Sequence, residues 1–514
     1  MTLYRHDHHF PQSLKPFSAA LLGLAGWTLS MPALADDFSM NTVETKANAL
    51  AQRPYAARPL PIPAFLKDLS PEQYAQIQDV SPLWRGEKRP FQVQFYLPGS
   101  WFRRPVVIRR VVDGVVRPIP FTLKHFTFGD LKVPKALPDD LGYAGFRLLA
   151  PLNTPPHYNE FISFLGATYF RAVGKGAIYG TSARGLGIDT AQPSGEIFPY
   201  FKEFWLEQPK AGARRMVVYA LLDSPVATGA YRFSIRQGDS TTVHVDATLY
   251  LRKPVQVLEL APLTSMYWHG HGRGAVAGDW HPAQHDASDL VMANGNGEWI
   301  TRPINNPRHI QTTTYTMDHP VGFGMIQQDR RFSAYEGIET QYQRRPSVWV
   351  RMEGDWGRGQ VRLVELPTNN RNLDNINAFW VPARAPAPMT PLHFAYSVRF
   401  FLDNHGLIPL AHPVNTYLGE DHRVAGARTV VIDFAGGALT AQPEGAPVRV
   451  HLDAAEGARI LSQRLEWDKD ARFWRVIAVI RPQPGTPSNV RCFLTLNHQV
   501  ISDTWTYLLH AAKE

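Results

Sequence analysis

Short segments of alternating hydrophobic and polar residues dominate the sequence from about residue 90 onwards. Successive side chains of a β-strand point to opposite faces, so this period-2 pattern predicts strands. Up to residue 402 it predicts strands within 91–97, 106–116, 216–251, 348–350, 360–366 and 393–401. The dipeptide Asp113-Gly114 is typical of a two-residue hairpin turn. Helical signals are few, and Ser70-Pro71-Glu72 predicts a short helix that ends at about Val80.

A second series of short strands follows near the C-terminus. These strands are predicted within 429–434, 448–452, 473–480, 490–496 and 501–509, at the spacing of a small β-sandwich. The polar stretch 403–422 predicts a linker, which divides a large β domain (36–402) from a small one (423–514). With 38 Gly and 42 Pro the chain is rich in turn residues, which also favours an all-β fold.

Polar residues concentrate in one stretch, 281–304, which reads HPAQHDASDLVMANGNGEWITRPI. It has neither the helical nor the strand period, so it predicts irregular backbone with turns at Asn294-Gly295 and Asn296-Gly297. Loops that are dense in polar groups and flanked by strands often carry a functional site. The alternative is a surface loop whose Asn and Gly residues only make turns.

Two features of these loops favour a carbohydrate site. Trp299 lies between Glu298 and Arg302, so an aromatic ring has charged hydrogen-bonding neighbours. A second acidic and asparagine-rich loop occupies 368–377. Two carboxylate-bearing loops with aromatic side chains predict sugar binding. The alternative for Trp299 is a position in the core, and Trp349 and Trp380 are predicted to be core residues.

The N-terminal residues predict export. Arg5 and Lys15 precede a mostly apolar run, 17–31, and Ala33-Leu34-Ala35 matches an A-x-A cleavage site. We therefore predict a Sec-type signal peptide over 1–35, cleaved after Ala35, with no transmembrane segment in the mature chain. Cys492 is the only cysteine, which excludes an internal disulfide and fits a bacterial periplasm.

Several classes of site lack their sequence motif. Gly174-Lys175-Gly176 lacks the spacing of a phosphate-binding loop, and no dinucleotide fingerprint, G-x-S-x-G elbow or nucleic-acid module occurs. Four histidines could assemble a metal site, namely His269, His271, His281 and His285, but the chain has no H-E-x-x-H motif. We predict no metal, no cofactor and no nucleic-acid partner. The net charge of +8 leaves an anionic partner open.

Long blocks of the sequence resemble one family. They are FLGATYFRAVGKGAIYGTSARGLGIDT (164–190), GEIFPYFKEFWLE (195–207), MANGNGEWITRPINNP (292–307), GFGMIQQDRRF (322–332), RRPSVWV (344–350), GDWGRGQVRLVELPT (354–368) and DNINAFW (374–380). The blocks resemble the periplasmic glucans biosynthesis proteins G and D. The resemblance implies a large galactose-mutarotase-like β-sandwich followed by a small immunoglobulin-like one. It also implies a role in making osmoregulated periplasmic glucans, which have β-1,2-linked glucose backbones.

Members of this family are similar to endo-β-1,2-glucanases that act with inversion. The resemblance implies that Asp374 is the general acid and that Asp286 is the general base, which reaches the attacking water through a hydroxyl relay. Tyr342 and Arg345 match substrate-contacting positions. The alternatives are purely structural roles: Asp374 caps a turn, and Asp286 forms a salt bridge with His285 or a nearby arginine.

The chain also departs from the family pattern. Ala287 stands where serine is usual, Thr301 stands where tryptophan is common, and Asn370 and Arg371 replace acidic residues. Two functions therefore remain open. The protein is a glycoside hydrolase acting on β-1,2-glucan, or it is a non-catalytic glucan-binding factor that assists the inner-membrane glucan glucosyltransferase. The predicted signal peptide, 1–35, contains no twin arginine, which points toward the export route of the G-type proteins.

Overall fold

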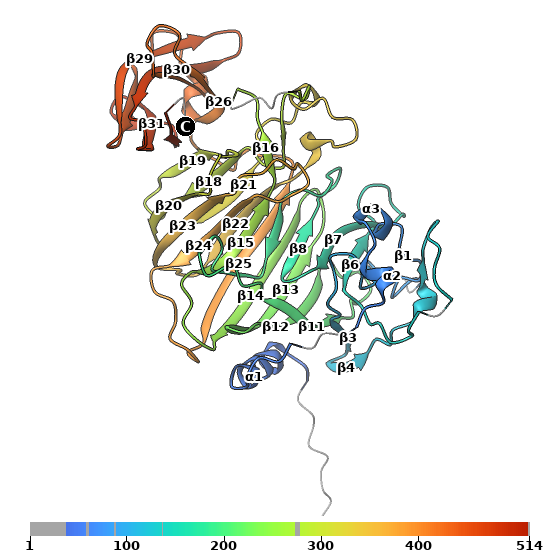
Figure 1. Cartoon of the computed structure of the whole chain (residues 1–514). Coiled ribbons are helices and arrows are strands. Elements are labelled where there is room, and N and C mark those ends of the chain that lie inside the picture. Colours follow the sequence, from blue (N-terminus) through green and yellow to red (C-terminus); the bar gives the residue numbers. More distant parts are fainter. Residues whose placement is uncertain (1–36, 58–60, 87–88, 136, 273–277, 512–514) are drawn as a thin grey trace, which may run out of the picture. The chain divides into compact units, whose positions relative to one another are not determined.

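The computed structural model describes residues 37–57, 61–86, 89–135, 137–272 and 278–511. Strands make up most of its regular structure (Figure 1), which confirms the all-β prediction. The helical elements of the described residues are α1 (Met40–Ala51), α2 (Ala64–Lys67), α3 (Pro71–Tyr74) and the 3-10 turns η1 (Leu123–His125), η2 (Phe332–Ala334), η3 (Tyr342–Arg344) and η4 (Gly437–Ala441). None of the described helices has the length and apolar character needed to span a membrane. The predicted signal peptide lies outside the described residues.

Two large sheets form the large β-sandwich. The first has the order β2 (Gln92–Tyr96), β6 (Gly145–Ala150), β7 (Asn159–Leu165), β8 (Tyr169–Ala172), β9 (Ser182–Arg184), β15 (Leu258–Ser265), β24 (Ile376–Pro382), β23 (Arg358–Glu365) and β20 (Gln311–Asp318), and β10 (Leu186–Ile188) also pairs with β15. The second runs through β19 (Trp299–Pro303), β18 (Asp289–Ala293), β21 (Gly322–Ile326), β22 (Ser347–Glu353), β25 (Leu392–Phe401), β14 (Thr241–Leu251), β13 (Ala227–Arg236), β12 (Met216–Asp223), β11 (Tyr200–Glu207), β3 (Val107–Val112) and β4 (Val115–Pro118). Two short ladders pair β1 (Gln78–Asp79) with β5 (Phe126–Thr127) and β16 (Tyr267–His269) with β17 (Gln284–His285).

Aromatic side chains fill the space between the two large sheets. Phe146 on β6 packs edge to face on Phe204 on β11, with ring centroids 5.1 Å apart. Phe164 on β7 contacts Phe233 on β13 in the same way at 5.2 Å. Each ring removes a large apolar area from water, so these pairs hold the sheets face to face.

The C-terminal strands form a small sandwich. One sheet has the order β26 (His412–Glu420), β27 (Arg428–Ala435), β30 (Phe473–Pro482) and β29 (Ala458–Asp468), and the facing strands are β28 (Val448–Ala454), β31 (Ser488–Leu496), β32 (Gln499–Val500) and β33 (Thr504–Leu509). Buried Ile432, Val476, Cys492 and Trp505 belong to its core. Because β33 pairs in parallel with β19, these facing strands continue the second large sheet.

The prediction of a large and a small β-sandwich is confirmed, but two stretches predicted to be irregular contain strands. The linker prediction for 403–422 misses β26, whose mostly half-exposed side chains give little alternation. In 281–304 the chain forms β17 and then the hairpin of β18 and β19. All five side chains of β18 are buried, so this strand has no polar face to reveal its period. The position of the domain boundary stays a prediction.

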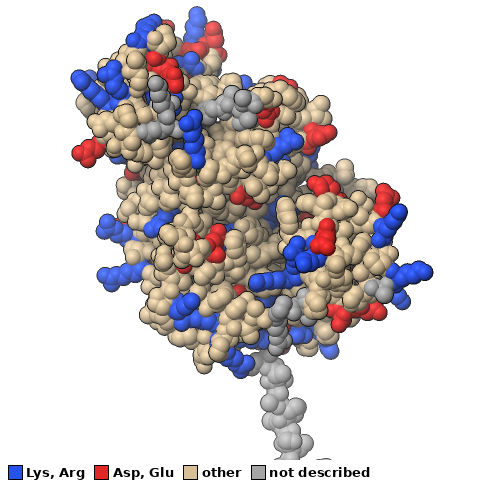
Figure 2. All heavy atoms as spheres, in the orientation of Figure 1, with Lys and Arg blue, Asp and Glu red and all other residues tan. Residues whose placement is uncertain are grey.

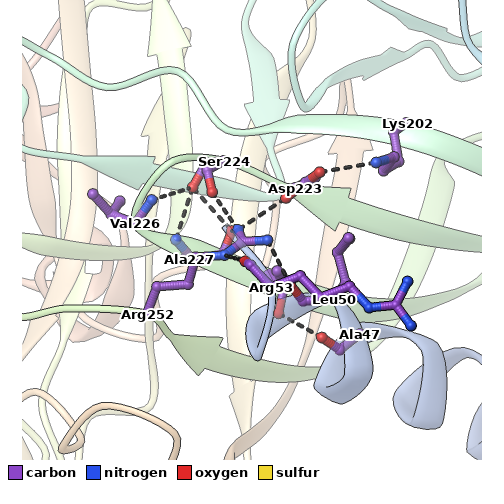
Figure 3. Close-up of polar contacts among 10 residues, drawn as sticks. Ala47, Leu50, Arg53, Lys202, Asp223, Ser224, Val226, Ala227 and Arg252 are labelled. Carbon is purple, nitrogen blue, oxygen red and sulfur yellow. Dashed lines mark hydrogen bonds and ion pairs between the residues drawn. The ribbon is translucent and has the colours of Figure 1, made fainter. Parts of the chain in front are cut away.

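Helix α1 lies in the N-terminal lead, where no helix was predicted. Its buried residues Val43, Ala47 and Ala51 are spaced by four, so they form one apolar face. Figure 3 shows how Arg252 holds the end of this helix: its Nη2 donates to the Leu50 carbonyl (2.7 Å) and its Nη1 to Asp223 Oδ1 (2.9 Å). The last carbonyls of a helix need such donors from outside the helix.

Helix α3 begins as predicted but is shorter. Ser70 Oγ accepts a hydrogen bond from the Gln73 amide (3.2 Å), as expected for an N-cap. The helix ends at Tyr74 rather than near Val80, because β1 begins at Gln78 and pairs with β5.

Charged side chains of both signs share the surface in Figure 2. On the face drawn there, Lys and Arg are interspersed with Asp and Glu. This face therefore offers no continuous basic surface to an anionic partner, despite the net charge of +8.

Candidate active site

Asp286 lies between β17 and β18 with only 3% of its surface exposed. Its backbone amide donates to the Met266 carbonyl (2.9 Å), which fixes the position of the residue. Arg345 Nη1 donates to Asp286 Oδ1 and forms an ion pair with it. Burial raises the pKa of Asp286, and the charges of Arg345 and Arg171 oppose that rise. The contact with a guanidinium favours the ionised carboxylate.

Arg345 and Tyr342 lie on one short turn beside this carboxylate. The Arg345 guanidinium lies 4.2 Å from the centroid of the Tyr342 ring, and Tyr342 is 2% exposed. A Cβ atom at Gly180 would lie 2.8 Å from Cβ of Arg345, so glycine there leaves room for the arginine. The structure therefore brings together Asp286, Tyr342 and Arg345, as the family resemblance implies.

Asp374 precedes β24 and is exposed to solvent. Protein atoms nevertheless surround it closely enough that desolvation raises its pKa to about 6, and the charge of Asp286 adds to this rise. Arg171 and Arg345 act in the opposite direction. The same two arginines thus influence both carboxyls, and the two carboxyls lie within electrostatic reach of each other.

The alternative in which Asp374 only caps a turn finds no support. Its carboxyl makes no hydrogen bond or ion pair with another described residue, whereas the neighbouring Asn375 makes the structural contacts. Asn375 Oδ1 accepts from the Tyr267 amide (2.8 Å), and its Nδ2 donates to the Leu366 carbonyl (2.9 Å). The asparagine fixes the loop and leaves the aspartate carboxyl available to a ligand.

Asn306 was not predicted as a site residue, yet it holds the loop that carries Asp374. Its Nδ2 donates to the carbonyls of Thr368 (2.8 Å) and Trp268 (3.2 Å), and its Oδ1 accepts from the Thr368 amide (3.0 Å). Burial raises the pKa of Tyr342, and Arg371 on the same loop is near enough to oppose that rise. Asn306 lies in the block 292–307, so the resemblance was the signal that could have identified it.

Trp280 is the second residue that the sequence analysis missed. Its side chain is 70% exposed, and its ring stacks on His281 with centroids 3.8 Å apart. Asp279 Oδ1 lies 2.6 Å from His281 Nδ1. Burial raises the pKa of Tyr342, and the Asp279 charge is near enough to add to that rise. An exposed, supported ring beside the Asp286 site can stack on a sugar. The sequence feature that could have identified Trp280 is its position directly before the polar stretch 281–304.

Two of the four histidines, His269 and His281, share Asp279, and the other two contact aromatic rings. His269 Nε2 lies 3.4 Å from Asp279 Oδ2, close to the His281 contact described above. His285 stacks on Tyr267, and His271 packs edge to face on Tyr417. Among the described residues, no group of three or more His, Cys, Asp or Glu side chains is arranged to hold a metal ion.

Trp299, Glu298 and Arg302 are not brought to Asp286. Trp299 is half-buried and stacks on Trp349 at 5.6 Å. Glu298 accepts hydrogen bonds from Arg491 (2.5 Å) and Thr504 (3.1 Å), so it joins β19 to the small sandwich. These three residues were predicted to bind substrate; the structure shows their contacts with other parts of the protein, and their role in substrate binding stays a prediction.

Arg302 and Thr301 face protein on every side. Arg302 is 1% exposed and forms an ion pair with the fully buried Glu365 (3.1 Å). Thr301 is fully buried and donates to Asp503 Oδ2 (2.5 Å). The departure at position 301 therefore lies at the junction with β33 and does not remove a ring from the Asp286 site. Trp349 and Trp380 are buried, which confirms their prediction as core residues.

A protein-family comparison covers all of these elements. The family model described as periplasmic glucan biosynthesis protein, MdoG, matches residues 38–509. The match runs through both sandwiches and includes Asp286, Tyr342, Arg345 and Asp374. The description of the family supports the predicted periplasmic location. Since the match covers most of the sequence, this chain belongs to the MdoG family of periplasmic glucan biosynthesis proteins.

Proposed function

We propose that the protein hydrolyses β-1,2-linked glucan by an inverting mechanism. One observation carries the proposal: a buried carboxylate in contact with a guanidinium lies near a second carboxyl whose pKa is raised to about 6. Glycoside hydrolysis needs one carboxyl that donates a proton and one that accepts it, and the ion pair with Arg345 favours the ionised form of Asp286.

The roles follow from the two environments. Asp374 donates its proton to the glycosidic oxygen as the bond from that oxygen to the anomeric carbon breaks. Water attacks the same carbon from the opposite face, and its proton passes through a hydroxyl group to Asp286. The two carboxyls interact electrostatically, and an inverting pair needs room for a water between them.

Ala287 favours a second candidate function. Its side chain is fully buried beside Asp286 and carries no hydroxyl, so one route for the proton is missing. A protein with a slow or incomplete proton route would bind the glucan without cutting it. It would then act as a binding factor for the membrane glucosyltransferase, which polymerises the chain.

Turnover by the purified mature protein separates these functions. The substrate is linear β-1,2-glucan, the readout is the appearance of new reducing ends, and optical rotation reports the anomer that forms first. We expect slow endo-cleavage with inversion. Binding of this glucan without any release of new ends over long incubation would reject hydrolysis and leave the binding factor.

Trp280 and Trp299 offer a matched test of where the sugar stacks. Trp280→Ala should weaken binding of β-1,2-glucan by about 1–3 kcal/mol, by analogy with stacking of bases on aromatic rings. Trp299→Ala should leave that affinity unchanged and reduce the free energy of unfolding by about 1–3 kcal/mol, because its ring packs on Trp349. Isothermal titration and thermal melting measure the two quantities. A loss of glucan affinity in Trp299→Ala, with unchanged affinity in Trp280→Ala, would instead place the sugar site at β19.

A further inference from the structure

Two strongly exposed aromatic side chains lie in a region that neither catalysis nor the core explains. Trp101 is 69% exposed and Phe198 is 52% exposed. Together with Tyr169 and Tyr200 they line a cavity of about 260 Å³, which Arg103 and Arg104 also border. Large apolar side chains that gather at an open cavity generally mark a binding surface.

The cavity is built from rigid parts. Trp101 lies at the tip of a tight turn that is closed by hydrogen bonds in both directions between Gly99 and Phe102 (3.0 and 2.8 Å). Ser100 in this turn has φ of 48°, a conformation that non-glycine residues rarely adopt. Ala167, which also lines the cavity, has φ of 42° and accepts a hydrogen bond from the Phe201 amide (3.1 Å). Strained backbone of this kind is often found at ligand sites.

A buried arginine supports two of the rings. Arg184 is 1% exposed and forms an ion pair with Glu196 (2.7 Å). Its guanidinium lies 5.0 Å from the centroid of the Tyr169 ring and 5.2 Å from that of Phe198. These cation–π contacts fix the orientation of both rings before any ligand arrives.

Tyr169 links the cavity to the proposed acid. It pairs with Arg184 across β8 and β9, and it lines the cavity. The Asp374 charge is also close enough to contribute to the raised pKa of Tyr169, after desolvation. Tyr169 therefore borders the cavity and lies within electrostatic reach of the proposed acid.

We propose that this cavity, between Trp101 and Phe198, is a distant subsite that binds a glucose ring of the same glucan chain. The proposal rests on the proposed substrate. Flat rings stack on the apolar face of a pyranose, and the donors of Arg103 and Arg104 suit its hydroxyl oxygens. The cavity lies just below the range of about 300–1,000 Å³ that is typical for drug-sized ligands, so it suits a single ring.

The test uses binding alone, so it does not depend on turnover. Trp101→Ala and Phe198→Ala are each combined with Asp374→Asn, which prevents cleavage, and Ile310→Ala serves as a control because Ile310 is 59% exposed outside this cavity. Each variant is titrated with long linear β-1,2-glucan and with the β-1,2-linked glucose disaccharide. We expect affinity for the long glucan to fall by about tenfold in both aromatic variants. The affinity for the disaccharide and the melting temperature should both equal those of the protein with Asp374→Asn alone.

Two outcomes would overturn the subsite. One is an affinity for long glucan that matches the Ile310→Ala control. The other is a change in sedimentation in place of a change in glucan affinity, which would mean that the two rings pack against a second copy of the chain. Wild-type protein that binds long glucan but never cuts it would reject hydrolysis and leave the subsite intact.

Discussion

Asp374→Asn should reduce kcat on linear β-1,2-glucan by about 10²–10⁴-fold, the usual cost of losing a positioned general acid. Asparagine keeps the shape of the side chain but has no proton to give to the glycosidic oxygen. Because the carboxyl makes no hydrogen bond with another described residue, the substitution should leave the melting temperature within a degree or two. Glucan affinity should also persist. Activity equal to that of wild type would exclude Asp374 as the acid.

The pH dependence of catalysis tests the same assignment without removing the group. Asp374 acts in its protonated form, so kcat/KM should fall as pH rises through about 6, the raised pKa of this carboxyl. The Arg171 charge opposes the rise in the pKa of Asp374, so Arg171→Gln should move this fall in kcat/KM, the basic limb of the pH profile, to higher pH. Arg358→Gln is the matched control, because Arg358 is exposed and does not contribute to the shift. A limb that stays in place in Arg171→Gln would mean that another group carries the proton.

Much of the fold could be predicted because half-buried strands leave a direct trace in the sequence. Strand β14 is an example, because buried Val243 and Val245 alternate with half-buried polar neighbours. The hairpin at Asp113-Gly114 was predicted from its turn residues: both have positive φ, and β3 and β4 pair on either side. Strand β18 could not be predicted in this way, since burial on both faces removes the alternation. Helix α1 was hidden by its polar and proline-rich surroundings, although its buried residues have helical spacing.

The site was predictable only in part, because exposure of a side chain depends on the whole fold. Trp299 and Trp280 have similar polar neighbours in the sequence, yet one packs on Trp349 and the other is 70% exposed. Arg302 looks like a ligand-binding cation until its partner Glu365 is known. Asp286 and Asp374 came from the family resemblance, and nothing in their spacing reveals that their charges interact in the fold.

Asp286→Asn should abolish turnover to a similar extent, about 10²–10⁴-fold, because no carboxylate would then accept the proton from water. This variant should also lose stability, unlike Asp374→Asn. Arg345 would keep a partly buried charge without its anion, since its side chain is only 21% exposed. Removing one partner of a fully buried pair costs about 3–5 kcal/mol, and the partial exposure of Arg345 should reduce that loss. Thermal melting measures the difference between the two variants.

The same substitution should change the titration of Asp374. The Asp286 charge contributes to the raised pKa of Asp374, so its removal should lower that pKa from about 6 toward the ordinary value. The direction is opposite to that expected for Arg171→Gln. Carbon-detected NMR titration of the Asp374 carboxyl can follow both changes. An unchanged pKa in Asp286→Asn would mean that the two carboxyls do not interact.

Ala287→Ser tests the proton route to Asp286 in the opposite way, because it adds a hydroxyl group where this chain has none. If that route limits the reaction, the variant should raise kcat on β-1,2-glucan by about tenfold or more, within the range that a positioned proton transfer contributes. The gain should vanish when Asp286→Asn is also present, since no carboxylate would then accept the proton from the added hydroxyl group. Position 287 is fully buried, so the melting temperature must be measured alongside the rate. A stable Ala287→Ser variant with the rate of wild type would show that the proton reaches Asp286 by a route that does not use this position.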